Sequence, residues 1–460
     1  MPEADDSYGG EAVGVDDPHA ASHQTVLGDS VKKFGHSSVI GHLRWVFLAT
    51  WVGVFSGLAS AIFLWLLDVA TVTREHSPWL LFGLPFAGLL ITYLYTQFGK
   101  SVTGGNNLLL DRIHDPESSV PFRMAPMILL TTVITHLFGG SAGREGTAVQ
   151  MGGTLADLAV GPLKLTKEDR QVLLMAGISA GFGSVFGTPL AGAIFGLEVL
   201  TIGARWRFHA LVPCLFASFV GDIVCRAVGI HHHSYSPPAT LSLTPSHLAW
   251  IAIAGIAFAG AGVGFVELTH SIQQLGKHLK VSVYVWPFLG GIVVILMTLL
   301  VGSQLYNGLG IPLIDQSFTS TTLPLYAFAL KIVFTSVTLG TGFKGGEVTP
   351  LFCIGATLGN AFAMVTHQDP ALFASLGFVA VFAGAANTPL ACAVMGIELF
   401  GGHLAIPLFL VCIVSYLLTG HRGIYGSQRV ASKNPFAKHK MGKTLHEIRE
   451  ARKLPRNQKN

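Results

Sequence analysis

Charged residues are scarce in this chain. Asp, Glu, Lys and Arg make up only 12% of its 460 residues, whereas half of the residues are hydrophobic and the mean hydropathy is +0.55. A water-soluble domain usually carries about 25% charged residues. The composition therefore excludes an ordinary soluble protein and indicates an integral membrane protein.

Cysteine is scarce too, and nucleotide-binding motifs are missing. The five cysteines lie apart in apolar segments without a CxxC pair, so each is interpreted as a small buried hydrophobic side chain. The chain has no GxxxxGK[ST] motif and no GxGxxG motif opening a βαβ unit. We therefore expect a transport protein rather than an enzyme, with no cofactor, no metal and no nucleic acid as partner. The histidine run 231–233 leaves a metal site open, but a solvated loop is the favoured interpretation.

The two ends of the chain lack long apolar runs. Residues 1–40 begin polar and acidic without the basic start of a signal peptide, and we predict a disordered tail there. Residues 426–460 are strongly basic, and their last part is a candidate for a short amphipathic helix. The positive-inside rule places both tails in the cytoplasm. We expect the protein to lie in the lipid of a bacterial inner membrane.

Apolar segments fill the chain between these tails. They lie near residues 46–69, 79–95, 125–138, 172–186, 210–228, 248–266, 285–301, 325–339, 373–385 and 406–418. Several are shorter than the roughly 20 residues that a spanning helix needs, and several contain Gly or Pro. The pattern predicts an all-α polytopic membrane protein with discontinuous helices that meet inside the membrane.

The chain also repeats itself. The sequence Thr-Pro-Leu-Ala occurs at residues 188–191 and again at 388–391. The same spacing of 200 residues joins Gly177 with Gly377, Arg144 with Lys344, Gly146 with Gly346, and Glu198 with Glu398. We predict two homologous membrane halves, residues 41–230 and 240–425, with the substrate site at their interface near the bilayer midplane. A structural role at a helix end is the favoured interpretation of both Glu198 and Glu398.

An arginine and a glutamate lie inside the glycine-rich stretch 139–153 of the first half. Even on the gentlest scale, a charge at the membrane centre costs roughly 2.5–3.5 kcal/mol, so Arg144 and Glu145 are candidates for function. Glycines allow backbone amides to turn toward an anion. In the functional interpretation, Glu145 competes with a permeant anion for these amides and moves aside when protonated. A helix-end ion pair of Arg144 and Glu145 is the alternative.

The second half offers its own acidic group in the stretch 345–350. Glu347 lies two residues before Thr349 and is a candidate proton relay, and a Lys344–Glu347 ion pair at i, i+3 is an equally favoured alternative. Asn106 and Asn107 follow two glycines and resemble a helix N-cap, where N–H groups attract anions; taken alone, an ordinary cap is the favoured interpretation.

These motifs resemble those of the CLC chloride channels and proton antiporters. GREGT at 143–147 is similar to the family signature GREGP, and TPLAGAIFGLE at 188–198 to its NAPLAG-type helix. GGEVTP at 345–350 falls where the family has GxFxP. The resemblance covers residues 40–430 and implies inverted repeats of tilted and broken helices and a homodimer with one pore per subunit.

The resemblance also implies site residues. It makes Glu145 the gating glutamate and Tyr425 the tyrosine that coordinates the central anion; on its own, Tyr425 also fits an interfacial aromatic anchor. Glu347 and Thr349 complete the proton and anion path. The expected anion-binding residues are Asn106, Gly143, Arg144, Gly146, Val348 and Tyr425.

Departures from the family pattern are similar to those of its CLC-F branch, the fluoride/proton antiporters. Asn106 stands where the family has a chloride-binding serine, Val199 where many exchangers have an internal proton-transfer glutamate, and Glu347 before the expected phenylalanine position at Val348. The phenylalanines that this branch has near the anion path are replaced by Asn107 and Leu110.

The leading hypothesis is a fluoride/proton antiporter that expels cytoplasmic fluoride with the inward proton gradient. Fluoride is strongly hydrated and needs good hydrogen-bond donors, such as those of Asn106, Thr349 and Tyr425. A chloride/proton antiporter or a voltage-gated-type chloride channel of the same family stays open as the alternative. A third hypothesis, from another class, is a membrane receptor or scaffold whose glycine-rich turns only pack helices.

Overall fold

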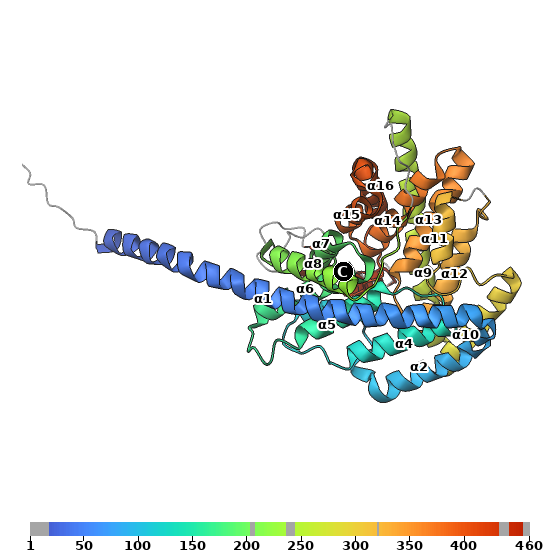
Figure 1. Ribbon diagram of the computed structural model, residues 1–460, viewed down its shortest axis with the longest axis horizontal. Coiled ribbons are helices and arrows are strands. Elements are labelled where there is room, and N and C mark those ends of the chain that lie inside the picture. The colour runs from blue at the N-terminus through green and yellow to red at the C-terminus, as the bar shows by residue number, and fades with distance from the viewer. Residues whose placement is uncertain (1–17, 203–207, 236–243, 320–321, 432–440, 454–460) are drawn as a thin grey trace, which may run out of the picture. The chain divides into compact units, whose positions relative to one another are not determined.

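The computed structural model describes residues 18–202, 208–235, 244–319, 322–431 and 441–453 (Figure 1). The chain divides into two compact units, residues 1–47 and 48–460. Helix α1 (Pro18–His76) begins in the first unit, within the segment predicted to be a disordered tail; residues 1–17 of that prediction lie outside the described residues. Proline is favourable at the first position of a helix, and no further proline interrupts the chain before Pro78. The predicted boundary at residue 40 is therefore no break in secondary structure.

Seventeen α-helices are present in the described residues. After α1, the first half contains the elements η1 (Pro78–Gly83), α2 (Leu84–Phe98), η2 (Lys100–Val102), α3 (Asn106–His114), α4 (Met124–Leu137), α5 (Glu145–Asp157), α6 (Lys167–Phe186), α7 (Pro189–Glu198), η3 (Phe208–Ala210) and α8 (Leu211–Ala227). The second half contains α9 (Pro245–His278), α10 (Val285–Val301), α11 (Ile311–Thr319), α12 (Ala327–Gly340), α13 (Val348–Thr366), α14 (Pro370–Ala386), α15 (Pro389–Phe400), η4 (Gly402–Leu404) and α16 (Ala405–Thr419).

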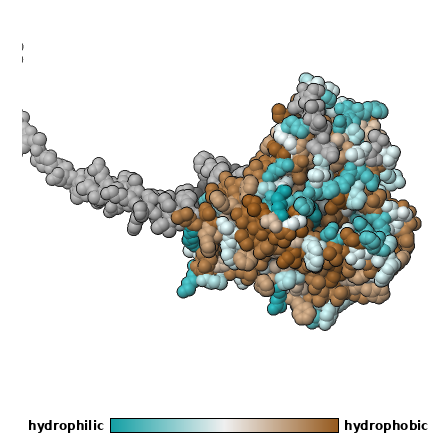
Figure 2. All heavy atoms as spheres, in the orientation of Figure 1, coloured by the Kyte–Doolittle hydropathy of each residue, from teal (hydrophilic) through white to brown (hydrophobic). Residues whose placement is uncertain are grey.

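Nine of the ten predicted apolar segments each coincide with a single α-helix, and the segment 79–95 covers η1 and α2. By length and composition, five helical segments in the described part of the chain can cross a membrane, and the other apolar helices are shorter, as expected for broken helices. Large hydrophobic side chains lie outside; Trp65, Phe86 and Leu300 are 60%, 65% and 87% exposed. Hydrophobic side chains cover much of the face in Figure 2. Soluble proteins rarely expose such large apolar areas, so this surface fits lipid.

The helices of each half pack in matching pairs through glycines. In the first half a Cβ on Gly152 of α5 would lie 2.3 Å from the carbonyl oxygen of Gly177 in α6, and in the second a Cβ on Gly355 of α13 would lie 1.9 Å from that of Gly377 in α14. No side chain larger than hydrogen fits there, so the backbones touch. These equivalent contacts make Gly177 the counterpart of Gly377, at the predicted spacing of 200 residues. They make Gly152 the counterpart of Gly355, at a spacing of 203 residues.

The predicted pairing of Arg144 with Lys344 and of Gly146 with Gly346 is therefore wrong by three residues. Helices α5 and α13 begin at Glu145 and Val348, which makes these two residues equivalent. Helix α6 has 20 residues and α14 has 17, so three extra residues in the first half restore the spacing of 200 by the end of the pair. A single spacing read from the sequence does not detect this difference in helix length.

A small sheet holds the C-terminal part of the chain. Strand β2 (Arg429–Ala431) pairs in parallel with β1 (Thr201–Ile202) and antiparallel with β3 (Met441–Thr444). Helix α17 (Leu445–Lys453) follows, as the predicted short helix of the basic tail. Thr444 and Glu447 form a capping box: each backbone N–H donates to the other side chain, which fixes the start of α17. The end of the described chain is thus folded rather than a loose tail.

Candidate functional site

Glu145 is the first residue of α5 and is fully buried. One of its carboxylate oxygens accepts a hydrogen bond from the Thr349 backbone N–H at 3.0 Å, and the Thr349 hydroxyl lies 2.6 and 2.8 Å from the two oxygens. The Arg144 side chain lies 3.6 Å away. Thr349 is the second residue of α13. The carboxylate therefore lies at the N-termini of α5 and α13, where free N–H groups and helix dipoles favour negative charge.

A short bridge of backbone hydrogen bonds joins the two motifs that carry these residues. The N–H of Gly143 donates to the carbonyl of Gly346 at 2.6 Å, and the N–H of Gly346 donates back at 2.8 Å. A Cβ on Gly143 would lie 2.8 Å from the Pro350 ring, and one on Gly346 would lie 2.9 Å from the Gly146 nitrogen. The bridge therefore requires glycine on both sides. The Gly143 amide, predicted to bind the anion, is engaged in this bridge.

Three other predicted site residues line one hollow. Asn106, Glu347 and Tyr425 border a cavity of about 200 Å³ together with Gln150 and Lys344. Asn106 begins α3, Glu347 precedes α13, and Tyr425 lies in the loop after α16 and is 4% exposed. The hollow thus collects amide, carboxylate, ammonium and hydroxyl groups from distant parts of the sequence. Such convergence of polar groups inside an apolar protein is typical of a substrate path.

A much smaller cavity adjoins the Asn106 and Tyr425 side chains. Its volume is about 10 Å³, close to the least space that one water molecule needs, and Phe195 and Val199 form part of its wall. The amide oxygen of Asn106 is buried without a hydrogen-bond partner among the described residues, and a Cβ on Gly146 would lie 3.0 Å from the amide nitrogen. The amide NH₂ group therefore lies beside Gly146 in the first turn of α5, whereas the amide oxygen is an unused hydrogen-bond acceptor.

Glu347 and Thr349 face different parts of this site. Thr349 contacts the Glu145 carboxylate, whereas Glu347 borders the hollow of Asn106 and Tyr425. The Lys344 ammonium, the alternative partner of Glu347, lies 4.5 Å from the centre of the Tyr95 ring. Val348, between the two, is buried at the first position of α13. The stretch after the glycine bridge therefore presents one hydroxyl to the gate and one carboxylate to the hollow.

Glu198 and Glu398 cap helices of the opposite half. The Glu198 carboxylate accepts from the N–H groups of Leu390 and Ala391 in α15 at 3.1 and 2.8 Å. The Glu398 carboxylate accepts from Leu190 and Ala191 in α7 at 2.9 and 2.7 Å. Helices α7 and α15 pack together (Figure 1). The predicted structural role at a helix end is confirmed for both residues.

Sequence reasoning missed two polar side chains. Gln150 borders the hollow, and a Cβ on Gly105 would lie 3.5 Å from its amide. Lys331 in α12 is fully buried and donates to the carbonyls of Tyr306 and Gly308 at 3.1 and 2.9 Å. A lysine inside the apolar segment 325–339 was a visible signal, whereas an isolated glutamine gave none.

Two side chains of the histidine run contact carboxylates. The imidazole of His232 lies 3.2 Å from Asp222, and that of His233 lies 2.6 Å from Asp315. The described residues contain no group of three side chains placed to ligate a metal.

The fold is that of a polytopic α-helical membrane protein with many short helices, and polar side chains from distant parts of the sequence meet inside it. A sequence model of the voltage gated chloride channel family matches residues 87–420. The chain belongs to this family, the CLC family. A chloride/fluoride channel protein of Pseudomonas syringae pv. tomato is 51% identical over 84% of this chain and 86% of its own length.

Solved structures show the same fold. A CLC-type fluoride/proton antiporter superposes with a TM-score of 0.81 at 34% identity, over 85% of this chain and 98% of its own. A slow cyanobacterial Cl⁻/H⁺ antiporter superposes with a TM-score of 0.72 at 21% identity, over 82% and 94%, and supports the fold alone. The predicted all-α CLC fold of repeated tilted and broken helices is confirmed.

Proposed function

We propose that the protein is a fluoride/proton antiporter that expels cytoplasmic fluoride with the inward proton gradient. The observation that carries this proposal is the position of the Glu145 carboxylate, held by Thr349 where the N-termini of α5 and α13 meet. Donors that hold a carboxylate also suit a small anion. The ionised side chain and a transported anion therefore compete for one place.

Coupling follows from this competition. A proton that binds Glu145 removes the negative charge that the helix N-termini hold, so the side chain leaves and an anion takes its place. An anion that leaves lets the ionised side chain return. Each passage of an anion thus requires protonation of the same carboxylate, and the two ions move in opposite directions.

The hollow beyond the glycine bridge supplies the rest of the path. Asn106 and Tyr425 offer an amide and a hydroxyl beside the small cavity, and Glu347 lies within the adjoining larger one. Glu347 is the proposed second proton carrier, because the wall position after Glu198 is the apolar Val199. A proton then passes between the carboxylates of Glu347 and Glu145.

Fluoride is the favoured anion because a strongly hydrated ion needs close, strong donors to replace its water. The NH₂ group of Asn106, which lies beside the first turn of α5, is the proposed donor, and the small volume of the adjoining cavity suits fluoride better than the larger chloride. The similar proteins include a fluoride/proton antiporter and a chloride/fluoride channel protein. Chloride/proton exchange or a chloride channel is the second candidate, favoured by the chloride in the latter name.

The proposal extends to the assembly and its location. We infer a homodimer with one pathway in each subunit, in the inner membrane, with both termini in the cytoplasm. The basic residues after Tyr425 and the family membership support this arrangement.

Flux from proteoliposomes tests the function. Purified protein is reconstituted, and fluoride or chloride efflux is recorded with ion electrodes together with a pH probe. We expect fluoride efflux faster than chloride efflux, coupled to proton uptake, and loss of the coupling in Glu145→Gln. Equal rates for the two anions would overturn the fluoride assignment, and fluoride flux without proton movement would make the protein a channel.

A further inference from the structure

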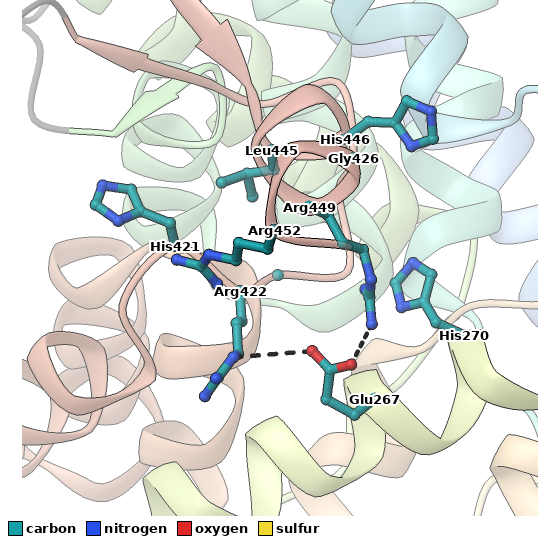
Figure 3. A pocket seen from close by; sticks show the side chains of 10 residues that line it. Glu267, His270, His421, Arg422, Gly426, Leu445, His446, Arg449 and Arg452 are labelled. Atoms are coloured by element: carbon teal, nitrogen blue, oxygen red, sulfur yellow. Dashed lines mark hydrogen bonds and ion pairs between the residues drawn. The ribbon is translucent and has the colours of Figure 1, made fainter. Parts of the chain in front are cut away.

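A basic hollow of about 250 Å³ opens between α9, the loop 421–426 and α17 (Figure 3). Arg422, Arg449 and Arg452 line it, and Glu267 is the only carboxylate among its lining residues. We call this space the basic hollow. It lies apart from Glu145 and Asn106, which do not border it, so the proposed gate and anion path do not account for its charge.

The Glu267 carboxylate contacts the guanidinium groups of two of these three arginines. Arg449 forms a short ion pair with one of its oxygens, and Arg422 lies 3.8 Å from the other. Figure 3 shows the two arginines converging on this carboxylate from different sides. Arg452 makes no ion pair with any described residue. The hollow therefore carries excess positive charge, with one carboxylate already bound where an anion would bind.

The arginines of α17 are held in place by the fold. The backbone N–H of Leu445 donates to the carbonyl of Gln428 at 2.9 Å, and that of His446 donates to the carbonyl of Gly426 at 3.0 Å. The Leu445 side chain is buried. Since Tyr425 lies in the same loop as Gly426, α17 both supports this loop and places its own arginines at the basic hollow.

The basic hollow is also connected to the proposed anion path. A neighbouring cavity of about 640 Å³ shares His270, Gly426 and Arg449 with the basic hollow. That cavity shares Asn107 and Ile424 with the hollow that Asn106 and Tyr425 border. The three spaces therefore adjoin in series, and the basic hollow lies at the end remote from Glu145.

We propose that the basic hollow is an anion-collecting site, in which the guanidinium groups of Arg449 and Arg452 bind a small inorganic anion before it enters the path. Glu267 is the resident competitor, which an incoming anion replaces on Arg449. Clefts lined by one sign of charge raise the local concentration of counter-ions and their rate of entry. This site rests on the proposed function for the identity of its anion. The competing explanation is that Glu267 and Arg449 only fasten α17 to α9.

The two explanations predict different directions of change in anion entry for variants of Arg449 and Glu267. If Arg449 binds the anion, Arg449→Gln weakens anion entry, whereas Glu267→Gln removes the competitor and strengthens it. If the ion pair only fastens α17, the two variants break the same contact and have the same effect. Arg452→Gln adds an independent variant, because this side chain has no ion pair to lose within the described chain. Lys443→Gln is the matched control, since Lys443 is exposed on β3 and does not line the basic hollow.

The test is the initial rate of transport against fluoride concentration, in right-side-out and in inverted membrane vesicles, at low and high ionic strength. At low ionic strength we expect Arg449→Gln and Arg452→Gln to raise the apparent KM about threefold to tenfold for fluoride on one side only, because the steering charge is lost. Glu267→Gln lowers this KM, and Lys443→Gln leaves it unchanged. The maximal rate and the fluoride-to-proton ratio stay at the wild-type values. High salt removes the differences, since the Debye length falls to about 3 Å at 1 M.

The proposal is overturned if Arg449→Gln and Glu267→Gln shift the KM in the same direction, or if Arg452→Gln leaves it unchanged at low ionic strength. If the proposed fluoride transport is wrong, the measurement gives a different result. In that case the wild type carries chloride instead of fluoride, and the same variants shift the KM for chloride.

Discussion

The Thr349 hydroxyl lies 2.6 Å from a carboxylate oxygen of Glu145, although the two residues are 204 positions apart and belong to different halves of the chain. Glu145 begins α5 and Thr349 lies in the first turn of α13, so each half supplies one side of the contact. The first half adds only Arg144, whose side chain lies 3.6 Å away, so the shorter contacts of this carboxylate come from the other half. The proposed gate is thus a product of the repeat interface.

Thr349→Val is expected to loosen the coupling of fluoride to protons. The change removes the hydroxyl donor and leaves the backbone N–H in place; a hydrogen bond to a charged group contributes about 1.5–3 kcal/mol. The ionised Glu145 is then held less tightly, and fluoride displaces it without protonation. Fluoride and proton fluxes recorded together should show more fluoride per proton. Thr349→Ser keeps the hydroxyl and should behave as wild type.

Thr357→Val is the control on the same helix. Its hydroxyl donates to the Cys353 carbonyl at 2.6 Å and does not contact Glu145. The fluoride-to-proton ratio should therefore stay unchanged. An unchanged ratio in Thr349→Val as well would remove Thr349 from the gate.

Gly143→Ala and Gly346→Ala are expected to disrupt the bridge between the halves. Both added methyl groups would lie under 3.0 Å from neighbouring atoms, and overpacking of this kind typically costs about 1–3 kcal/mol. Thermal unfolding in detergent, followed by size-exclusion fluorescence, should show a lower midpoint. Gly260→Ala in α9 meets no atom within 4 Å and should not destabilise the protein. If the thermal unfolding midpoint falls equally in all three variants, steric crowding at Gly143 and Gly346 is not the cause.

Glu198→Ala and Glu398→Ala are expected to lower stability without uncoupling transport. Each change leaves two backbone N–H groups of the opposite half without their carboxylate acceptor, and a hydrogen bond to a charged group contributes about 1.5–3 kcal/mol. The unfolding midpoint measures this loss. Glu117→Ala is the control, because its pair with Lys167 is solvent-exposed and such pairs contribute little. Uncoupled flux in a Glu198→Ala protein of normal stability would instead make Glu198 a proton carrier.

Helices with long apolar runs were predicted well, including the buried α6 and α14, whereas the buried helix α5 was not predicted from an apolar run. Long apolar runs mark helices such as α9 and α10, because their outer faces must be apolar. Helix α5 is buried at 12 of its 13 positions, so it needs no apolar run, and its Gly, Thr and Gln residues resemble a loop. The same holds for the start of α13. The two helices that carry the site were therefore recognisable by motif alone.

Site residues were predictable where a motif named them, but their partners were not. Motifs predicted Glu145, Asn106 and Tyr425 as site residues, and the last two border one hollow. The contact between Glu198 and Ala391 spans 193 positions, and no local sequence pattern predicts it. The three extra residues of α6 likewise shift the alignment of the halves, so pairing by a constant spacing failed at α5 and α13. Long-range contacts depend on packing that a linear pattern does not contain.

Asn106→Ser is expected to reduce the preference for fluoride over chloride. Serine replaces the amide by a hydroxyl on a shorter side chain, so a strong donor is lost and the cavity of about 10 Å³ next to Tyr425 becomes larger. Loss of one hydrogen bond to a charged group, about 1.5 kcal/mol or more, corresponds to roughly a tenfold change in the ratio of initial fluoride and chloride efflux rates. Ion electrodes on proteoliposomes measure both rates. Asn107→Ser is the matched control, because the Asn107 side-chain amide oxygen accepts from the Ser427 N–H, and Asn107 borders the larger hollow but not the small cavity. It should keep the wild-type ratio. If Asn106→Ser keeps that ratio as well, selectivity arises elsewhere on the path, and the volume beside Tyr425 does not select the anion.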